Sequence, residues 1–269
     1  MTAAVLIHGF SGSPASWRRV KALLDVPSRA PAVCGHGGES APAISKGPAA
    51  FEAEVDRLAA VVRAEVPAAR LLVGYSLGGR LALGLLVRHP DLFLGAVLIG
   101  ANPGIGGEDA RVARRHEDER WARLIEEEGL AVFDNEWSAL PLFASQHDVD
   151  AGRLAEQQRT RLGHDPAALA AAMRTLSLGA MPDYRPALPG VACPVDLIAG
   201  SLDTTFVALA RKMAEKLPQA SVRIVDGVGH NVPLEAPSRL ARLLNDSAMR
   251  TAVATRGPAS GRRPERGRD

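Results

Sequence analysis

Short aliphatic runs separated by longer amphipathic segments recur along both ends of the chain. The aliphatic runs lie at residues 3–7, 70–73, 94–99, 194–199 and 221–225. The run at 70–73 has the length and composition of a buried parallel strand, and the other runs are also expected to be strands. The pattern therefore predicts parallel strands whose connections are long enough to hold helices.

The segments between these runs have helical character. Apolar residues recur every three or four positions from Phe51 to Ala64, and we also expect helices at 16–24 and 77–89. A short strand is expected at Ala30 to Val33. Strands that alternate with helices are typical of a mostly parallel sheet covered on both faces, which is the α/β fold class.

The alternation stops near residue 106 and resumes near residue 187. The intervening segment is charged and helical in pattern, and its charge-rich part is expected to be a solvated helix face laced by ion pairs one turn apart. We expect residues 106–186 to be a helical lid inserted into a core formed by residues 1–105 and 187–248.

Composition fits one such domain, and charge distinguishes its C-terminal end. The 269 residues suffice for a sizeable core, which aliphatic residues and alanine must fill because aromatic residues make up only 4% of the chain. The net charge of +2 arises from residues 249–269, where six arginines stand against two acidic residues. We expect this segment to be a disordered basic tail without a nucleic-acid partner, although arginine-rich ends can bind nucleic acid or anionic lipid.

The remaining composition indicates a cytoplasmic protein. Cys34 and Cys193 are far apart in sequence and suit reduced thiols better than a disulfide framework. The N-terminus has no signal-like pattern, and no apolar run is long enough to span a bilayer. We expect a monomer or a weak homodimer.

The most informative motif is Gly-Tyr-Ser-Leu-Gly-Gly-Arg at residues 74–80, between a predicted strand and a predicted helix. This is the form of a nucleophile elbow, in which a serine occupies a strained turn that only small neighbours permit. In a chain with 26 glycines such a pattern also arises by chance. Ser76 therefore needs partners before it counts as a nucleophile.

Two further strands end at residues that can complete a triad. Asp203 follows the run at 194–199, and His230 follows the run at 221–225. The carboxyl ends of parallel strands meet at one edge of a sheet, so both residues are expected beside Ser76. Their order along the chain, Ser, Asp, His, resembles that of α/β-hydrolases.

The loop after the first strand, His8 to Gly12, resembles the loop that contributes a backbone N–H to the oxyanion hole of that fold. The backbone N–H groups of Phe10 and Leu77 are the candidates. His8 is expected to shape this loop, and His36 is expected to lie in a turn. No residues have metal-ligand spacing and no loop has a phosphate-cradling pattern, so we expect no metal and no cofactor.

Closer inspection extends the resemblance to one family. The heptapeptide at 74–80, the turn at 101–105, the lid stretch at 132–137 and the segment at 161–166 resemble the MenH family, the 2-succinyl-6-hydroxy-2,4-cyclohexadiene-1-carboxylate synthases of menaquinone biosynthesis. The resemblance covers the chain from about residue 5 to 245. It implies a lyase that eliminates pyruvate from 2-succinyl-5-enolpyruvyl-6-hydroxy-3-cyclohexene-1-carboxylate.

The same resemblance implies Ser76, Asp203 and His230 as the catalytic triad. A guanidinium offers a fixed fork of donors that suits carboxylates, and the implied substrate carries several carboxylates. Without the resemblance, Arg80 is equally well explained as a surface charge, and Arg114 and Arg161 are better explained as surface charges. Arg159 is the alternative to Arg161 as the second substrate-binding arginine of the lid, because the placement of one gap decides which of the two aligns with the family's residue. The implied substrate-binding residues are Tyr75, Arg80, Arg114, Trp137 and Arg161.

In the reaction that the resemblance implies, His230 deprotonates Ser76, which then acts as a base on a substrate C–H group. Two other functions stay open beside this one. A serine carboxylesterase or C–C bond hydrolase for an anionic substrate would instead form an acyl-enzyme on Ser76. A catalytically silent protein that binds a small acid is the third interpretation.

The chain departs from the family pattern at its start. The His-Gly loop begins at residue 8, so the N-terminal hairpin that usually precedes it in this fold is missing, unless the start codon is misplaced. Ala30 to Val33 would then be an exposed sheet edge that favours dimerisation or aggregation. Cys34 stands where the family has the proline of a Pro-Gly-His-Gly turn.

Overall fold

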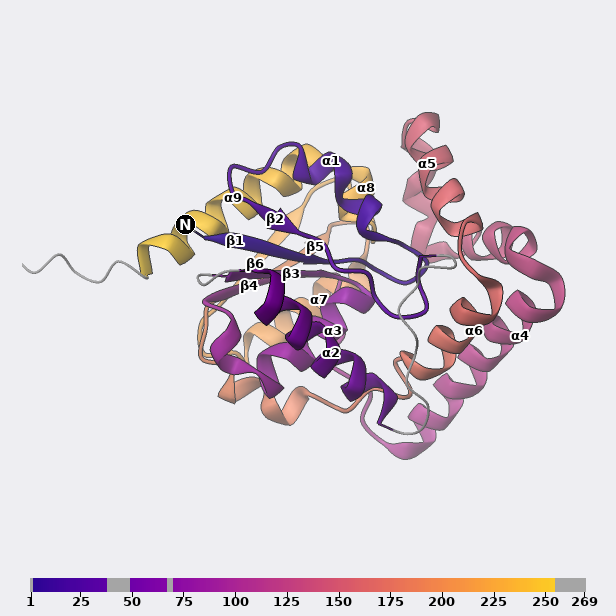
Figure 1. Cartoon of the computed structure of the whole chain (residues 1–269), viewed down its shortest axis with the longest axis horizontal. Coiled ribbons are helices and arrows are strands. Elements are labelled where there is room, and N and C mark those ends of the chain that lie inside the picture. Colours follow the sequence, from indigo (N-terminus) through magenta and orange to yellow (C-terminus); the bar gives the residue numbers. More distant parts are fainter. Residues whose placement is uncertain (1, 38–48, 67–69, 255–269) are drawn as a thin grey trace, which may run out of the picture.

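A parallel sheet divides the helices of the core into two layers (Figure 1). The structure is a computed structural model that describes residues 2–37, 49–66 and 70–254. In these residues six strands pair in the order β2-β1-β3-β4-β5-β6, and every pair is parallel. The strands are β1 (Ala3–Ile7), β2 (Ser28–Arg29), β3 (Arg70–Tyr75), β4 (Gly95–Ile99), β5 (Val195–Gly200) and β6 (Ala220–Val225).

Helices connect the strands, and an insertion of helices separates β4 from β5. The core helices are α1 (Arg18–Lys21), α2 (Ala50–Glu65), α3 (Leu77–Arg88), α7 (Thr204–Ala214), α8 (Val232–Glu235) and α9 (Pro237–Ala254). The insertion contains α4 (Glu108–Ser138), α5 (Ala151–Leu162) and α6 (Pro166–Thr175). Short 3-10 helices are η1 (Pro14–Trp17), η3 (Pro90–Leu92), η4 (Pro141–Asp148) and η5 (Arg185–Gly190).

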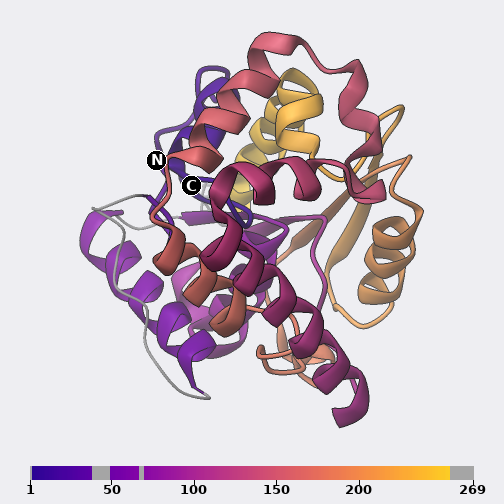
Figure 2. The ribbon, with the colours of Figure 1, turned by 90° about the vertical axis from the view of Figure 1, so that its right-hand side faces the viewer.

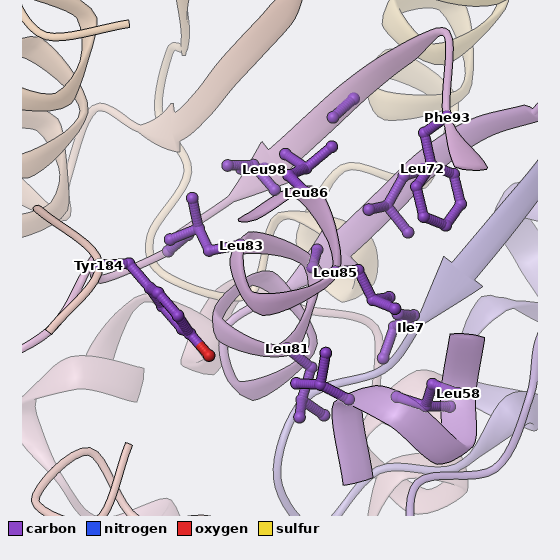
Figure 3. Close-up of a cluster of buried hydrophobic side chains, with 14 of the residues drawn as sticks. Ile7, Leu58, Leu72, Leu81, Leu83, Leu85, Leu86, Phe93, Leu98 and Tyr184 are labelled. Atoms are coloured by element: carbon purple, nitrogen blue, oxygen red, sulfur yellow. The ribbon is translucent and has the colours of Figure 1, made fainter. Parts of the chain in front are cut away.

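The two faces of the sheet bury alternate residues of the inner strands β1, β3, β4 and β5, whereas the edge strands β2 and β6 are more exposed. Val5 and Ile7 of β1 pack with α2 and α3, whereas Ala4 and Leu6 pack with α9 on the opposite face. Figure 3 shows the first of these layers, in which side chains such as Leu85 of α3 meet those of the strands. Burial on both faces explains why the strands read as continuous aliphatic runs.

The strand order opens a crevice at the carboxyl end of the sheet. From β1 the chain first adds β2 on one side and then returns to place β3 on the other side. The connections on the two sides therefore diverge between β1 and β3, and such switch points are the usual ligand-binding places of open parallel sheets.

The insertion lies over this carboxyl end (Figures 1 and 2). Its longest helix, α4, bends at Gly129, whose φ of 83° is readily adopted by glycine and rarely by other residues. The insertion also has a small apolar core of its own. Its buried members are Ala122, Ile125, Phe133, Leu169, Ala170 and Met173.

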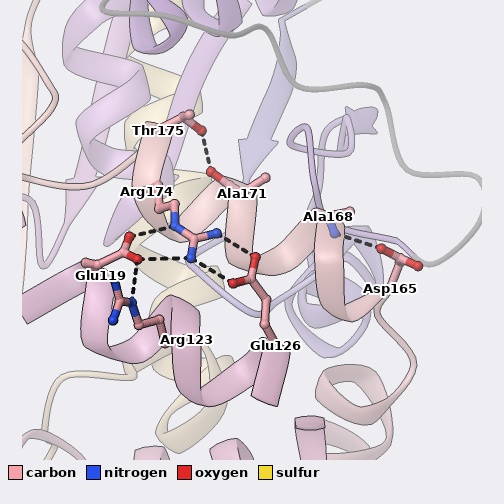
Figure 4. A network of polar contacts seen from close by, with 8 residues as sticks. All are labelled: Glu119, Arg123, Glu126, Asp165, Ala168, Ala171, Arg174 and Thr175. Atoms are coloured by element: carbon pink, nitrogen blue, oxygen red, sulfur yellow. Dashed lines mark hydrogen bonds and ion pairs between the residues drawn. The ribbon is translucent and has the colours of Figure 1, made fainter. Parts of the chain in front are cut away.

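Ion pairs fasten α6 to α4 on the outside of the insertion (Figure 4). Arg174 donates to Glu119 at 2.7 Å and to Glu126 at 2.6 Å, and Arg123 also donates to Glu119 at 3.0 Å. The hydrogen bonds from Arg174 and then Arg123 lower the pKa of Glu119 to about 2. The side chains of Arg174, Glu119 and Glu126 are one-third or more exposed and that of Arg123 is 66% exposed, so solvent weakens each pair.

The prediction of a strand at Ala30 to Val33 is wrong, because pairing with β1 ends at Arg29. Pro31 has no N–H to give to a neighbouring strand. The N–H of Val33 donates instead to His8 Nε2 at 3.2 Å. The edge of the sheet on this side is therefore the two-residue strand β2.

The first helix is shorter than expected. Ser13 caps it as a capping box with Ser16, but the regular α-helical part covers only Arg18–Lys21, and the turn before it is a 3-10 helix. Residues up to Leu24 follow in turns.

The boundary expected for the tail at residue 249 is also wrong. Helix α9 continues to Ala254. Ala248 and Thr251 are buried, and Arg250 donates to Asp196 of β5, so contacts with the core hold this end of the helix. Residues 255–269 lie outside the described part of the chain, so the expectation of a disordered tail there stays a prediction. Within the described ranges, no helix has the length and apolarity needed to cross a bilayer.

The fastening of α6 predicts a pH-dependent loss of stability. Replacement Arg174→Met should lower the free energy of unfolding by about 1 kcal/mol or less at pH 7, since the pairs are partly exposed. Because the pKa of Glu119 is lowered in the folded state, this contribution is complete above its ordinary pKa of 4.5 and is lost as the pH falls towards 2. Urea unfolding of wild type and variant between pH 7 and pH 3 measures it.

The control for this measurement is Arg120→Met. Arg120 is an exposed arginine of α4 and forms no ion pair within the described residues. Its replacement should leave stability unchanged at every pH. A difference between wild type and Arg174→Met that stays constant from pH 7 to pH 3 would contradict the assignment.

Candidate active site

Ser76 occupies a sharp turn between β3 and α3. Its φ of 52° and ψ of −109° are strained for a residue with a side chain, and among described non-glycine residues only Ser11 shares the positive φ. The Ser76 N–H donates to the carbonyl of Ile99 in β4 at 2.9 Å. The turn thus has the geometry of a nucleophile elbow.

The glycines of the motif allow α3 to approach the sheet. A Cβ on Gly74 would lie 2.3 Å from the carbonyl oxygen of Gly78, and a Cβ on Gly78 would lie 2.1 Å from that of Ile7 in β1. Any side chain at either position would push the helix away from the strands. The motif therefore reflects packing around the serine.

The structure brings Ser76, His230 and Asp203 together as the sequence predicts. His230 Nε2 lies 3.1 Å from Ser76 Oγ, and His230 Nδ1 lies 2.7 Å from Asp203 Oδ2. The other carboxylate oxygen of Asp203 accepts the N–H of Phe206 at 3.2 Å. With the Nδ1 proton directed at the carboxylate, Nε2 is free to accept the serine proton.

Gly100 makes room for the imidazole. It follows β4 with a φ of 55°, and a Cβ at this position would lie 2.9 Å from His230 Cε1. His230 is 3% exposed, so the ring has little space in which to shift.

A cavity opens beside the triad and contains two arginines. Arg80, one turn into α3, donates to the carbonyl of Leu176 at 2.7 Å and forms no ion pair within the described residues. Arg114 of α4 donates to Asp118 at 2.9 Å. Burial and the nearby charge of Arg114 lower the pKa of Arg80 to about 9. A guanidinium in such surroundings stays protonated but is stabilised by a bound anion.

Asp118 is a site residue that sequence analysis missed. It lies in the charged run taken for a solvated face, yet it is 2% exposed and lines the cavity. Burial raises the pKa of its carboxyl group, against the effect of Arg114. The spacing of four residues from Arg114 was the available signal.

Aromatic side chains form the rest of the wall. Tyr75 and Phe143 lie 5.5 and 6.2 Å from the His230 ring, and Trp137 lies 5.6 Å from Phe10. Phe206, at 4.5 Å from His230, also lines the cavity and was not expected from the sequence. The cavity thus combines a cationic part with an apolar part.

The chain matches the alpha/beta hydrolase family over residues 4–243. It is 34% identical over 251 residues to the 2-succinyl-6-hydroxy-2,4-cyclohexadiene-1-carboxylate synthase of Salmonella agona (strain SL483), covering 87% of this chain and 88% of that protein. The corresponding synthase of Enterobacter sp. (strain 638) is 32% identical over 242 residues, which are 89% of either chain. The solved structure of MenH from S. aureus aligns with a TM-score of 0.88 and 25% identity over 93% of this chain and 94% of that one.

The chain belongs to the MenH family. Its fold is accordingly that of the α/β-hydrolases, as the sequence predicts. The described residues contain no group of three or more His, Cys, Asp or Glu side chains able to hold a metal ion.

In this MenH-family chain the second lid arginine lies outside the Ser76 cavity. Arg161 is 3% exposed, pairs with Asp134, donates to Ser138 Oγ at 2.7 Å and to Ser11 Oγ at 3.2 Å, and lines an adjoining cavity. Arg159 is exposed and lines neither cavity. The geometry thus favours Arg161 over Arg159, with its charge already compensated by Asp134.

The two predicted oxyanion donors adjoin the nucleophile. Phe10 lines the Ser76 cavity, and Leu77 is the first residue of α3, where backbone N–H groups have no acceptor within the helix. His8 contacts the loop before Phe10, since its Nδ1 lies 2.9 Å from the carbonyl oxygen of Gly9, and its Nε2 accepts the N–H of Val33. Burial lowers the pKa of His8 to about 4, which keeps it neutral.

The glycine beside His230 provides a test of the triad geometry. Replacement Gly100→Ala should displace the imidazole, because the new methyl group would stand too close to it. We expect the rate at which a serine-directed phosphonate labels Ser76 to fall at least about tenfold, as for a misplaced general base.

The matched control is Gly227→Ala. Gly227 also has a positive φ, 63°, but a Cβ there would meet nothing within 4 Å. It carries the same backbone strain without the crowding, so it should show a normal labelling rate. Equal labelling rates in the two variants would rule out the proposed crowding of His230.

Proposed function

We propose that this chain eliminates pyruvate from 2-succinyl-5-enolpyruvyl-6-hydroxy-3-cyclohexene-1-carboxylate, giving 2-succinyl-6-hydroxy-2,4-cyclohexadiene-1-carboxylate. The observation that carries the proposal is one cavity that holds a hydrogen-bonded Ser76–His230–Asp203 triad together with Arg80 and Arg114. The relatives of the MenH family bear the name of this synthase. The reaction makes the protein a carbon–oxygen lyase.

The triad supplies the base. His230 takes the proton of Ser76 Oγ, and Asp203 stabilises the resulting imidazolium. The serine oxygen then removes an acidic C–H proton from the ring of the substrate. Electrons move through the conjugated system, the C–O bond to the enolpyruvyl group breaks, and pyruvate leaves as its enolate. The enolate takes up the proton held by His230, which restores the triad, and no water is consumed.

Charge that develops on the substrate requires stabilisation. We assign the backbone N–H groups of Phe10 and Leu77 to the succinyl carbonyl oxygen, where negative charge builds up. Arg80 and Arg114 bind the carboxylates, and Tyr75 and Trp137 contact the carbon skeleton. Arg80 suits this role because the described residues give it no carboxylate of its own.

The insertion then serves as a lid. It contributes Arg114 and Trp137 to the cavity, so the site is complete only when α4 is packed against the core. A covered site also keeps water away from the enolate and from the ring. This explains how a hydrolase fold can favour elimination over hydrolysis.

The variants Ser76→Ala and His230→Ala test the proposal. Each should lower pyruvate release from the enolpyruvyl substrate by about 10⁴-fold or more, because loss of the serine or the histidine of a protease triad costs about 10⁶-fold, with substrate binding largely retained. Pyruvate is followed by coupling to lactate dehydrogenase.

Ser201→Ala is the control, because this hydroxyl bonds to Asp226 away from the cavity. It should leave the rate unchanged. Near wild-type rates in both triad variants would refute the triad assignment. Rapid hydrolysis of a chromogenic acetate ester with a Ser76-dependent burst would favour a serine esterase instead.

A further inference from the structure

Ser11 is a strained residue next to a proposed oxyanion donor. The N–H of Gly12 donates to the carbonyl of Gly9 at 3.1 Å, so Gly9 to Gly12 form a turn with Phe10 and Ser11 at its centre. Ser11 adopts a φ of 54°. Glycine is the residue that favours a positive φ at this turn position. A serine there persists only if its surroundings hold it.

The insertion holds this turn at several points. His164, in the connection from α5 to α6, lies with its Nε2 3.0 Å from the carbonyl oxygen of Ser11. Arg161 donates to Ser11 Oγ at 3.2 Å. The Phe10 ring packs against Trp137 of α4, at 5.6 Å between ring centroids. The turn is therefore fixed from the insertion side and not only by its own strand.

The hydrogen bonds of His164 define its tautomer. The N–H of Gly37 donates to Nδ1 at 3.0 Å, so Nδ1 carries the lone pair and Nε2 carries the proton. Nε2 thus donates to the Ser11 carbonyl. His164 is 6% exposed, and its ring lies 5.5 Å from that of His36, which in turn contacts Phe10. Both ring nitrogens are used, and neither faces the Ser76 cavity.

We propose that His164 is a positioning residue: through its Nε2–H it holds Ser11 at positive φ and so keeps the Phe10 N–H aimed at the charge that forms beside Ser76. If Ser11 relaxes to a negative φ, the peptide groups of the turn reorient and Phe10 moves with them. The inference rests on the proposed function for the substrate, but the oxyanion geometry concerns any serine reaction at this site.

Two conservative variants separate the roles of the ring nitrogens. In His164→Gln the side-chain amide can replace Nε2 and keep the donor to Ser11. In His164→Asn it can replace Nδ1 and keep the acceptor for Gly37. Each variant loses one buried hydrogen bond, so both should lose similar stability.

The expected result is a split in activity. His164→Asn should lower kcat for pyruvate release about 100-fold with KM nearly unchanged, the effect of losing one oxyanion donor. His164→Gln should stay within about threefold of wild type, and phosphonate labelling of Ser76 should follow the same order. A purely structural role would instead affect both variants equally.

The labelling rate keeps this inference separate from the proposed function. If the wild type releases no pyruvate, but His164→Asn is labelled slowly and His164→Gln is labelled at nearly the wild-type rate, the proposed substrate is refuted. The positioning role is then supported. Equal labelling rates for both variants, with pyruvate release intact in wild type, would overturn the positioning role and leave the function standing.

Discussion

The close approach of α3 to the ends of β1 and β3 is the constraint on which the site depends. Helix and strands touch backbone to backbone at Gly74 and Gly78, and the chain can enter the helix there only through the strained turn at Ser76. That turn directs the hydroxyl to the carboxyl end of the sheet. The loops after β5 and β6 end at the same place, so Asp203 and His230 meet the serine there.

We propose that a charge imbalance gives this site its selectivity. Among the described residues, Arg80 has only a backbone carbonyl as hydrogen-bond partner, and Arg114 donates to the buried carboxylate of Asp118 in the same cavity. A guanidinium such as that of Arg80 is costly to bury without an anion beside it. In the proposed function, the strained elbow supplies reactivity, and the arginines together with the insertion restrict that reactivity to polycarboxylates.

The strands and the triad could be predicted because they depend on local pattern. Buried parallel strands are recognisable as aliphatic runs, and a triad requires residues at their carboxyl ends. The end of the edge strand near Ala30 to Val33 could not be predicted, because the Val33 N–H donates to the imidazole of His8 and is not available to pair with a strand. Asp118 was also hidden, because the packing of α4 against α6 and the core buries one carboxylate of a run that looks fully solvated.

The central claim is that Ser76 removes a proton and never carries an acyl group. Turnover in oxygen-18 water, with mass spectrometry of the ring product and of the intact protein, tests it most directly. The account predicts a ring product without oxygen-18 and a protein of unchanged mass. Oxygen-18 in the ring product, or an acyl group on the peptide that contains Ser76, would contradict it.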